Sequence, residues 1–257
     1  MSIHSTAIVD KKAVLDENVE VGPYSVIGPH VQIGGGTVVG PHVVINGPTK
    51  IGRDNHIFQF ASIGEVPQDK KFHGENSTLE IGDRNHIREF VTINRGTEDG
   101  GGVTKVGNDN WLMAYIHIAH DCIVGNNVIF SNAASLAGHV TVDDHAILGG
   151  FTLVHQFCHI GSHAFCGMGS AVSKDVPPYV IVSGNYAKPI GINKEGLKRR
   201  GFSPETIRAI QNAYKIMVRS HKPREQALDE VQSYVEQYGE VKRFVDFILA
   251  SERGIVR

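Results

Sequence analysis

The chain has 257 residues, a formal net charge of −2 and a pI of about 6.7, which suits one large domain or a repeat structure with an appendage. This charge balance argues against nucleic-acid binding, which usually requires a strongly basic face, and no apolar run is long enough to span a membrane. Three scattered cysteines make no disulfide framework, which favours a reducing compartment. The N-terminus enters the first repeat without room for a signal peptide, so we expect a cytoplasmic protein.

Apolar residues recur at every sixth position through most of the first 172 residues. One series runs from Ile3 to Ile63 and returns at Ile81, Ile87 and Ile93, and a second series, one residue out of phase, runs from Val106 to Val172. A period of six fits neither a helix nor a two-sided sheet. It is typical of a parallel β-helix, in which three short strands form each coil of eighteen residues and each strand sends one aliphatic side chain inward. We therefore expect a β-helical solenoid over residues 1–190.

Two segments interrupt the period, at residues 65–80 and 94–105. Loops that leave a solenoid on one side often carry binding residues. The second loop contains three consecutive glycines, Gly100 to Gly102, but lacks the lysine and the strand-to-helix context of a phosphate-binding loop. We expect this loop to be flexible or to approach another subunit closely.

After residue 190 the six-residue period ends, and residues 191–257 are expected to form a small α-helical domain. Ser203 and Pro204 are typical of a helix cap and a first helical position. Two further helices are expected at about 223–238 and 240–251. Such a domain would cover the open end of the solenoid, where an unpaired edge invites aggregation.

The eighteen-residue coil places certain polar residues in columns on the outer surface. His120, Gly138 and Gln156 fall in one column, and Asp121 and His139 fall in the next. His120 lies two places after an inward-facing isoleucine, so its ring is expected to point outward. A base, a residue without a side chain and an amide in one column are typical of a reaction site.

Four motifs, together with the hexapeptide period, resemble the bacterial UDP-N-acetylglucosamine O-acyltransferase family over the whole chain. They are His117-Ile118-Ala119-His120-Asp121, Ala137-Gly138-His139-Val140, Val154-His155-Gln156-Phe157-Cys158 and the segment from Asn193 to Gly201. The resemblance implies a left-handed parallel β-helix and a homotrimer with active sites between subunits. It implies transfer of a (3R)-3-hydroxyacyl group from acyl carrier protein to the 3-hydroxyl of UDP-N-acetylglucosamine, the first step of lipid A biosynthesis. The donor would be carried on the phosphopantetheine of the carrier protein, with no metal and no other cofactor.

The resemblance also implies roles for the central residues. His120 would be the general base, because an imidazole titrates near neutral pH. Asp121 would orient the ring or stabilise the imidazolium, although adjacent residues of a strand point to opposite faces. The backbone N–H of Gly138 would hold the oxyanion, where a missing side chain permits close approach.

Further positions match substrate-contacting residues of the family. The sugar-side residues would be Gln68, Asp69 and Lys71, and His117 and His139 would help to place the substrates. The nucleotide- and phosphate-side residues would be His155, Gln156, Asn193, Glu195 and Arg199. Met168 stands where some members carry glycine along the acyl-chain groove, so it should shorten the accepted chain.

Three alternatives remain open from the sequence. A γ-class carbonic anhydrase is also a trimeric β-helix and holds zinc with interface histidines, for which His117, His120, His139 and His155 are candidates. An acetyltransferase that uses coenzyme A shares the repeat. A non-catalytic solenoid scaffold is the third alternative, and replacement of His120 separates it from the enzymes.

Overall fold

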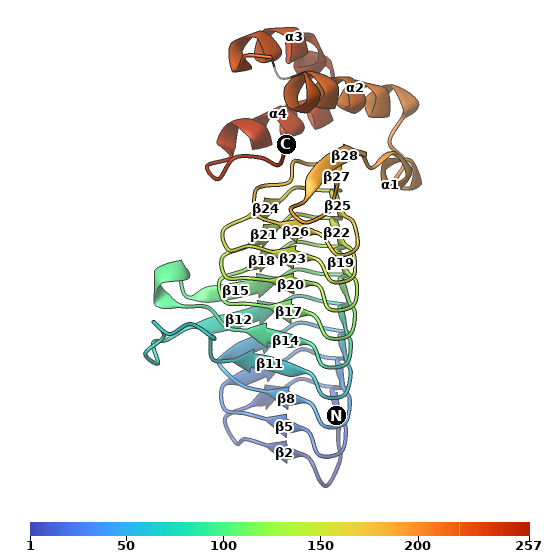
Figure 1. Ribbon diagram of the computed structural model, residues 1–257. Coiled ribbons are helices and arrows are strands. Elements are labelled where there is room, and N and C mark those ends of the chain that lie inside the picture. Colours follow the sequence, from blue (N-terminus) through green and yellow to red (C-terminus); the bar gives the residue numbers. More distant parts are fainter. Residues whose placement is uncertain (221) are drawn as a thin grey trace.

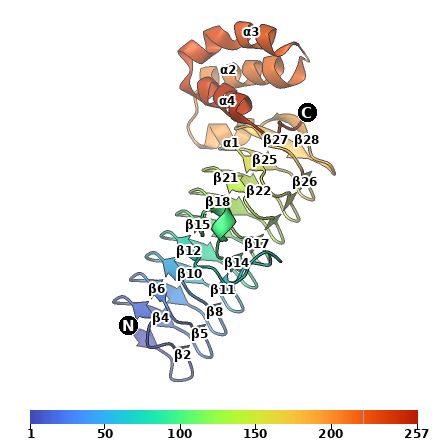
Figure 2. The same cartoon turned by 90° about the vertical axis from the view of Figure 1, so that its left-hand side faces the viewer.

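The computed structural model describes residues 1–220 and 222–257 and consists of a three-sided prism of short strands with helices beyond its C-terminal end (Figure 1). Face A of the prism is an eleven-stranded sheet, face B a nine-stranded sheet and face C an eight-stranded sheet. The strands are parallel except where the last two strands of face A meet. Figure 2 shows the coils stacked along the prism axis.

Within each face, neighbouring strands come from successive coils. In spatial order, face A comprises β1 (Ser2–Ile3), β4 (Glu20–Val21), β7 (Val38–Val39), β10 (His56–Ile57), β13 (His86–Ile87), β16 (Trp111–Leu112), β19 (Ile129–Phe130), β22 (Ile147–Leu148), β25 (Phe165–Cys166), β27 (Val180–Ser183) and β28 (Lys188–Ile192). Face B comprises β2 (Ile8–Val9), β5 (Val26–Ile27), β8 (Val44–Ile45), β11 (Ser62–Glu65), β14 (Thr92–Asn94), β17 (His117–Ile118), β20 (Ser135–Leu136), β23 (Leu153–Val154) and β26 (Ala171–Val172). Face C comprises β3 (Val14–Leu15), β6 (Val31–Ile33), β9 (Thr49–Ile51), β12 (Thr78–Ile81), β15 (Val103–Val106), β18 (Ile123–Val124), β21 (Thr141–Val142) and β24 (His159–Ile160).

Strand pairing explains both the period and its change of phase. Ser2 pairs with Glu20, eighteen residues later, so three strands complete one coil. His56 pairs with His86, thirty residues later, because the first loop adds twelve residues, a multiple of six that preserves the phase. His86 pairs with Trp111, twenty-five residues later, because the second loop adds seven residues and shifts the phase by one. The β-helix is therefore continuous through both insertions.

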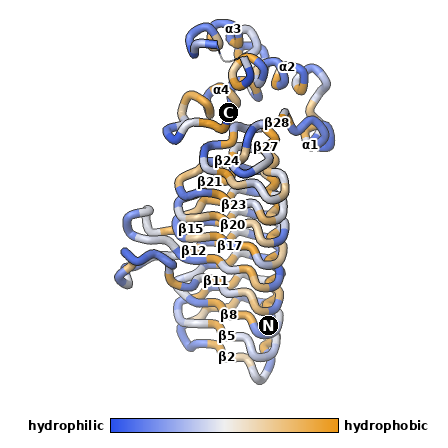
Figure 3. Tube along the Cα trace, in the orientation of Figure 1, coloured by the Kyte–Doolittle hydropathy of each residue, from blue (hydrophilic) through white to orange (hydrophobic). Residues whose placement is uncertain are grey.

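The inward positions form one apolar core along the axis of the prism. Ile27, Ile63 and Phe130 are each at most 1% exposed. Cys166 is inside the same core, and burial raises the pKa of its thiol to about 12, so it packs as a small apolar residue. Figure 3 shows that hydrophobic positions recur from coil to coil, whereas the two projecting loops are mainly hydrophilic. The burial of these aliphatic side chains is the main favourable contribution to the stability of the solenoid.

The C-terminal region contains more elements than the sequence predicted. Strand β27 pairs with β28 in an antiparallel hairpin, and helix α1 (Lys194–Arg199) follows it; neither was predicted. Helix α2 (Pro204–Tyr214) continues as a π-helical turn (Lys215–Arg219), followed by α3 (Arg224–Gln237) and α4 (Gly239–Ala250). Ser203 accepts a hydrogen bond from the Thr206 N–H, as its predicted cap position requires. In the described part of the chain, no helix has the length and apolar character that a membrane crossing requires.

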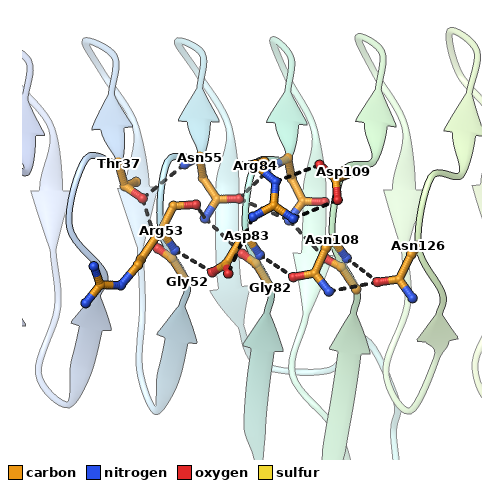
Figure 4. A network of polar contacts seen from close by, with 12 residues as sticks. Thr37, Gly52, Arg53, Asn55, Gly82, Asp83, Arg84, Asn108, Asp109 and Asn126 are labelled. Carbon is orange, nitrogen blue, oxygen red and sulfur yellow. Dashed lines mark hydrogen bonds and ion pairs between the residues drawn. The ribbon is translucent and has the colours of Figure 1, made fainter.

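The corner between faces C and A contains a network of polar side chains (Figure 4), and the amides of Asn55, Asn85 and Asn110 form a buried column in this corner. Asn85 Oδ1 accepts from the Asn110 N–H at 2.9 Å, and Asn85 Nδ2 donates to Asn55 Oδ1 at 3.0 Å and to Gly107 O at 3.0 Å. The side chain of Asn85 thus links three successive coils. Backbone groups that strand pairing leaves free at the corner find their partners in this column.

Replacing Asn85 with alanine is expected to lower the free energy of unfolding by about 3 kcal/mol, because several buried polar groups lose their partner. Urea unfolding followed by circular dichroism measures the change. The matched control is Asn132→Ala at an exposed corner, which should change the free energy by about 0.5 kcal/mol or less. Equal effects of the two substitutions would contradict a stabilising role for the column.

Candidate active site

His120 and Asp121 lie in the corner that joins β17 on face B to β18 on face C. His120 Nδ1 lies 2.7 Å from Asp121 Oδ2, and the side chain of His120 is 15% exposed whereas that of Asp121 is 1% exposed. Asp121 has φ of 60°, a left-handed conformation that belongs to a turn. The alternation of side chains along a strand therefore does not apply to this pair, and the turn brings the carboxylate to the imidazole. This contact fixes the Nδ1 proton toward the carboxylate and leaves Nε2 as the basic nitrogen.

Gly138 lies one coil further along the prism, against the ring of His120. A Cβ atom on Gly138 would lie 2.6 Å from His120 Cε1 and 2.7 Å from Nε2, closer than real Cβ atoms approach. The backbone N–H of Gly138 has no acceptor within the described part of the chain. The corner thus places an imidazole base beside an amide donor that remains free for a ligand.

His117 and His139 flank the pair of His120 and Asp121. Thr92 Oγ1 lies 2.7 Å from His117 Nδ1, and burial, with a smaller contribution from His120, lowers the pKa of His117. The ring of His139 meets that of His120 edge to face at 5.1 Å and stacks on Phe157 at 4.4 Å. Burial also lowers the pKa of His139, although the negative charge of Asp121 partly opposes this. Two neutral imidazoles near neutral pH can each donate and accept a hydrogen bond from a polyhydroxyl substrate.

The zinc alternative can be tested on the same residues. Donor atoms of His120, Asp121 and His139 lie within 4.8 Å of one another, whereas His117 and His155 are not in this group. The carboxylate of Asp121 already accepts from Thr97 N at 2.8 Å, from Thr97 Oγ1 at 2.6 Å and from His120 Nδ1. These three hydrogen bonds occupy most of the about four lone-pair positions of the carboxylate, so little of it is left for a zinc ion. The arrangement favours a hydrogen-bonded base over a metal centre.

The loop between β11 and β12 carries the predicted sugar-side residues. Asp69 is half-buried, accepts a hydrogen bond from the Lys71 N–H at 3.0 Å and acts electrostatically on His139. Gln68 and Lys71 are exposed. Arg95 donates to Gly64 O of β11 at 3.2 Å, and its guanidinium lies 5.9 Å from the ring centroid of Phe72 in the loop. Because Asp69 acts on His139, this part of the loop lies near the corner that contains His120.

His155 and Gln156 are exposed at the same corner, two coils beyond His120 and one coil beyond Gly138. Arg253, which follows α4, brings its Nη2 to 2.8 Å from His155 Nδ1. Nδ1 also lies 3.1 Å from the carbonyl oxygen of Gln156. Arginine only donates and a carbonyl only accepts, so the two contacts favour opposite tautomers of His155. Sequence reasoning missed Arg253, which is 98 residues away and belongs to no motif.

The remaining predicted residues lie on other edges of the prism. Asn193 accepts from Gly196 N as the cap of α1 and donates to His163 O, at the corner between faces C and A. Glu195 pairs with Lys198 at 2.9 Å, and Arg199 is exposed. Met168 is 81% exposed at the corner between faces A and B. The structure thus does not bring these four residues to His120 within one chain.

Comparisons with known proteins cover the whole chain. The family model described as "Udp N-acetylglucosamine O-acyltransferase; Domain 2" matches residues 175–256, and the bacterial transferase hexapeptide model matches residues 12–47 and 104–138. The acyl-[acyl-carrier-protein]–UDP-N-acetylglucosamine O-acyltransferase of Herminiimonas arsenicoxydans is 61% identical over 99% of both chains. That of Thiobacillus denitrificans is 58% identical over 100% of this chain and 99% of its own. The chain belongs to this acyltransferase family.

Solved structures of the family have the same fold. The UDP-N-acetylglucosamine O-acyltransferase of Moraxella catarrhalis superposes with a TM-score of 0.97, at 48% identity and over 100% of both chains. The Francisella novicida acyltransferase gives a TM-score of 0.96 at 44% identity, over 99% of this chain and 94% of its own. The predicted left-handed parallel β-helix with a small helical C-terminal region is confirmed.

Proposed function

We propose that the chain transfers a (3R)-3-hydroxyacyl group from acyl carrier protein to the 3-hydroxyl of UDP-N-acetylglucosamine, the first step of lipid A biosynthesis. The observation that carries this proposal is the contact between the His120 ring and Gly138, whose N–H is free among the described residues. An acyl transfer from a thioester to an alcohol requires a base for the alcohol and a donor for the developing oxyanion. The family relatives named above carry both substrates in their names.

The geometry supports a direct transfer. His120 Nε2 takes the proton of the sugar hydroxyl as the hydroxyl oxygen attacks the thioester carbonyl. The carbonyl oxygen becomes an oxyanion, and the Gly138 N–H donates to it. When the C–S bond breaks, the departing phosphopantetheine sulfur takes the proton from the imidazolium, so that the ester and a free thiol are the products. Asp121 stabilises the imidazolium while it carries this proton.

The substrates would be placed by residues from more than one edge of the prism. His117, His139 and the loop residues Gln68, Asp69 and Lys71 lie on the side of His120 and suit the sugar. Asn193, Glu195 and Arg199 suit the nucleotide and its phosphates but lie on another edge. A homotrimer in which a neighbouring copy presents its α1 beside His120 would unite the two sets, and His155 and Gln156 would complete the site.

The proposal also includes the compartment and the donor. Buried free thiols at Cys122, Cys158 and Cys166 suit a reducing cytoplasm. The donor brings its own phosphopantetheine, so the residues at the corner need no further cofactor for this chemistry. A coenzyme A thioester carries the same phosphopantetheine arm, and the two donors must be compared in the assay.

Mass spectrometry of the product tests the proposed function. The purified chain is incubated with UDP-N-acetylglucosamine and a series of 3-hydroxyacyl carrier proteins, and in a second arm with the corresponding coenzyme A thioesters. A UDP-sugar heavier by one 3-hydroxyacyl group, formed faster from the carrier protein, is the expected result. Formation only from coenzyme A, or no acylated sugar with any donor, would contradict the proposal.

Replacing Met168 with glycine is expected to move the preferred donor to a longer chain by a few carbons. The methionine side chain adds about four heavy atoms to the surface on which we propose the acyl chain lies, and packed atoms cannot share that volume. The same donor series measures the change, with Met168→Leu as the control that retains bulk and should keep the shorter preference. An unchanged length preference in the glycine variant would show that Met168 does not line the acyl-chain groove.

A further inference from the structure

The loop of residues 94–105 packs against Asp121, the carboxylate beside the ring of His120. Its short 3₁₀ helix (Glu98–Gly100) begins after Thr97, and Gly100 packs so closely on the Asp121 carboxylate that a Cβ atom there would overlap it. Thr97 itself is 4% exposed. Of the three consecutive glycines, Gly100 lies against Asp121, whereas a Cβ atom on Gly101 would meet no atom within 4 Å. The predicted flexibility or close approach to another subunit stays a prediction.

Thr97 holds the carboxylate with two donors. Its N–H donates to Asp121 Oδ1 at 2.8 Å, and its hydroxyl donates to Oδ2 at 2.6 Å, the oxygen that also faces His120. The hydroxyl is the donor in this bond because a carboxylate can only accept, and Thr97 Oγ1 in turn accepts from the Gly100 N–H at 3.2 Å. The result is a continuous chain of hydrogen bonds from Gly100 through Thr97 and Asp121 to His120.

We propose that Thr97 is a positioning residue that acts on His120 through Asp121. This inference rests on the proposed function, in which His120 is the base. The Thr97 hydroxyl fixes the carboxylate in the plane where it meets Nδ1, so that Nε2 points consistently at the substrate. The Thr97 hydroxyl and the imidazole both donate to Asp121 Oδ2. Because the hydroxyl stabilises part of the negative charge on this oxygen, the carboxylate attracts the imidazolium proton less strongly.

Several other titratable groups near His120 could also affect its protonation. His139 Nε2 lies 3.8 Å from Asp121 Oδ2, His117 faces His120 electrostatically, and Asp69 and Asp99 act on His139. Replacing Thr97 with valine alters none of these groups. Valine also suits the extended backbone of Thr97, at φ −121° and ψ 159°, and it keeps the backbone N–H that donates to Asp121.

Steady-state kinetics of Thr97→Val and Thr97→Ser test the inference. Without the hydroxyl, kcat is expected to fall about tenfold, since a hydrogen bond to a charged group is lost. The acid limb of the pH–kcat profile should move to higher pH, because the carboxylate then attracts the imidazolium more strongly. KM for UDP-N-acetylglucosamine should stay within about twofold, and serine should restore both kcat and the profile.

Thr78→Val is the matched control. The Thr78 hydroxyl donates to Gly102 O at 3.4 Å, in the same loop, but does not contact Asp121, so kcat and the pH profile should equal those of the wild type. An unchanged kcat and acid limb in Thr97→Val would overturn the inference. So would a serine variant as slow as the valine variant, because the side chain would then act only through its shape.

A readout that needs no acyl transfer separates this inference from the proposed function. In protein labelled at the histidine ring carbons, the His120 resonance, assigned by comparison with His120→Gln, should titrate at higher pH in Thr97→Val than in the wild type. Identical titrations would overturn the role of Thr97 even if the wild type is active. An inactive wild type would contradict the proposed function. The titration of the His120 resonance would still show whether Thr97 acts on His120.

Discussion

Replacing His120 with glutamine is expected to lower kcat for acyl transfer about a thousandfold, since general-base catalysis contributes roughly 10²–10⁴-fold. Glutamine occupies a similar volume beside Gly138 but cannot carry the hydroxyl proton. KM for UDP-N-acetylglucosamine should change by no more than a few-fold, because the ring acts on the reacting proton rather than on the rest of the sugar nucleotide. Initial rates of product formation measure both constants.

The control for this substitution is His4→Gln, an exposed histidine of the first coil, which forms the N-terminal end of the prism (Figure 1). It should retain the wild-type rate. A His120→Gln enzyme with more than about a third of the wild-type kcat would show that another group removes the proton, and the assignment of the base would be wrong.

Replacing Gly138 with alanine is expected to lower kcat about a hundredfold, the magnitude typical of losing one oxyanion donor. The added Cβ would lie 2.6 Å from His120 Cε1, so the ring must move and the base and the amide lose their common geometry. The melting temperature should change little, because His120 is a partly exposed side chain that can rotate away. Kinetics and thermal unfolding of the same preparation separate the two effects.

Gly239→Ala is the control for this substitution. Gly239 begins α4 and has no atom within 4 Å of a built Cβ, so its variant should match the wild type in rate and melting temperature. If Gly138→Ala also retained full activity, neither the close approach to His120 nor the amide donor could be part of the reaction.

The β-helix could be predicted because a buried position at every sixth residue admits few other folds. Ile27 and Phe130 lie in the core as the period required. The change of phase between Ile93 and Val106 was visible but unexplained, because its cause is the length of the second loop, which only strand pairing reveals. The hairpin of β27 and β28 and the short helix α1 were missed, since a few residues with glycine and proline carry no measurable period.

The sequence predicted those contacts of the candidate site that join residues eighteen positions apart in successive coils. The eighteen-residue spacing placed His120 over Gly138, and the structure has this contact. The meeting of Asp121 with His120 depends on a positive φ at Asp121, which the sequence does not show. Thr97 and Arg253 reach the site from distant segments, and Asn193 lies at another corner, so none of these relations could be read from local spacing.

The most direct test of the proposed reaction is a crystal structure of the chain with UDP-N-acetylglucosamine and a non-hydrolysable amide analogue of the acyl phosphopantetheine. We predict that the analogue's carbonyl oxygen lies about 3 Å from the Gly138 nitrogen and the sugar 3-hydroxyl about 3 Å from His120 Nε2. A carbonyl bound at another edge of the prism, or a 3-hydroxyl beyond hydrogen-bonding distance of His120, would contradict this reaction.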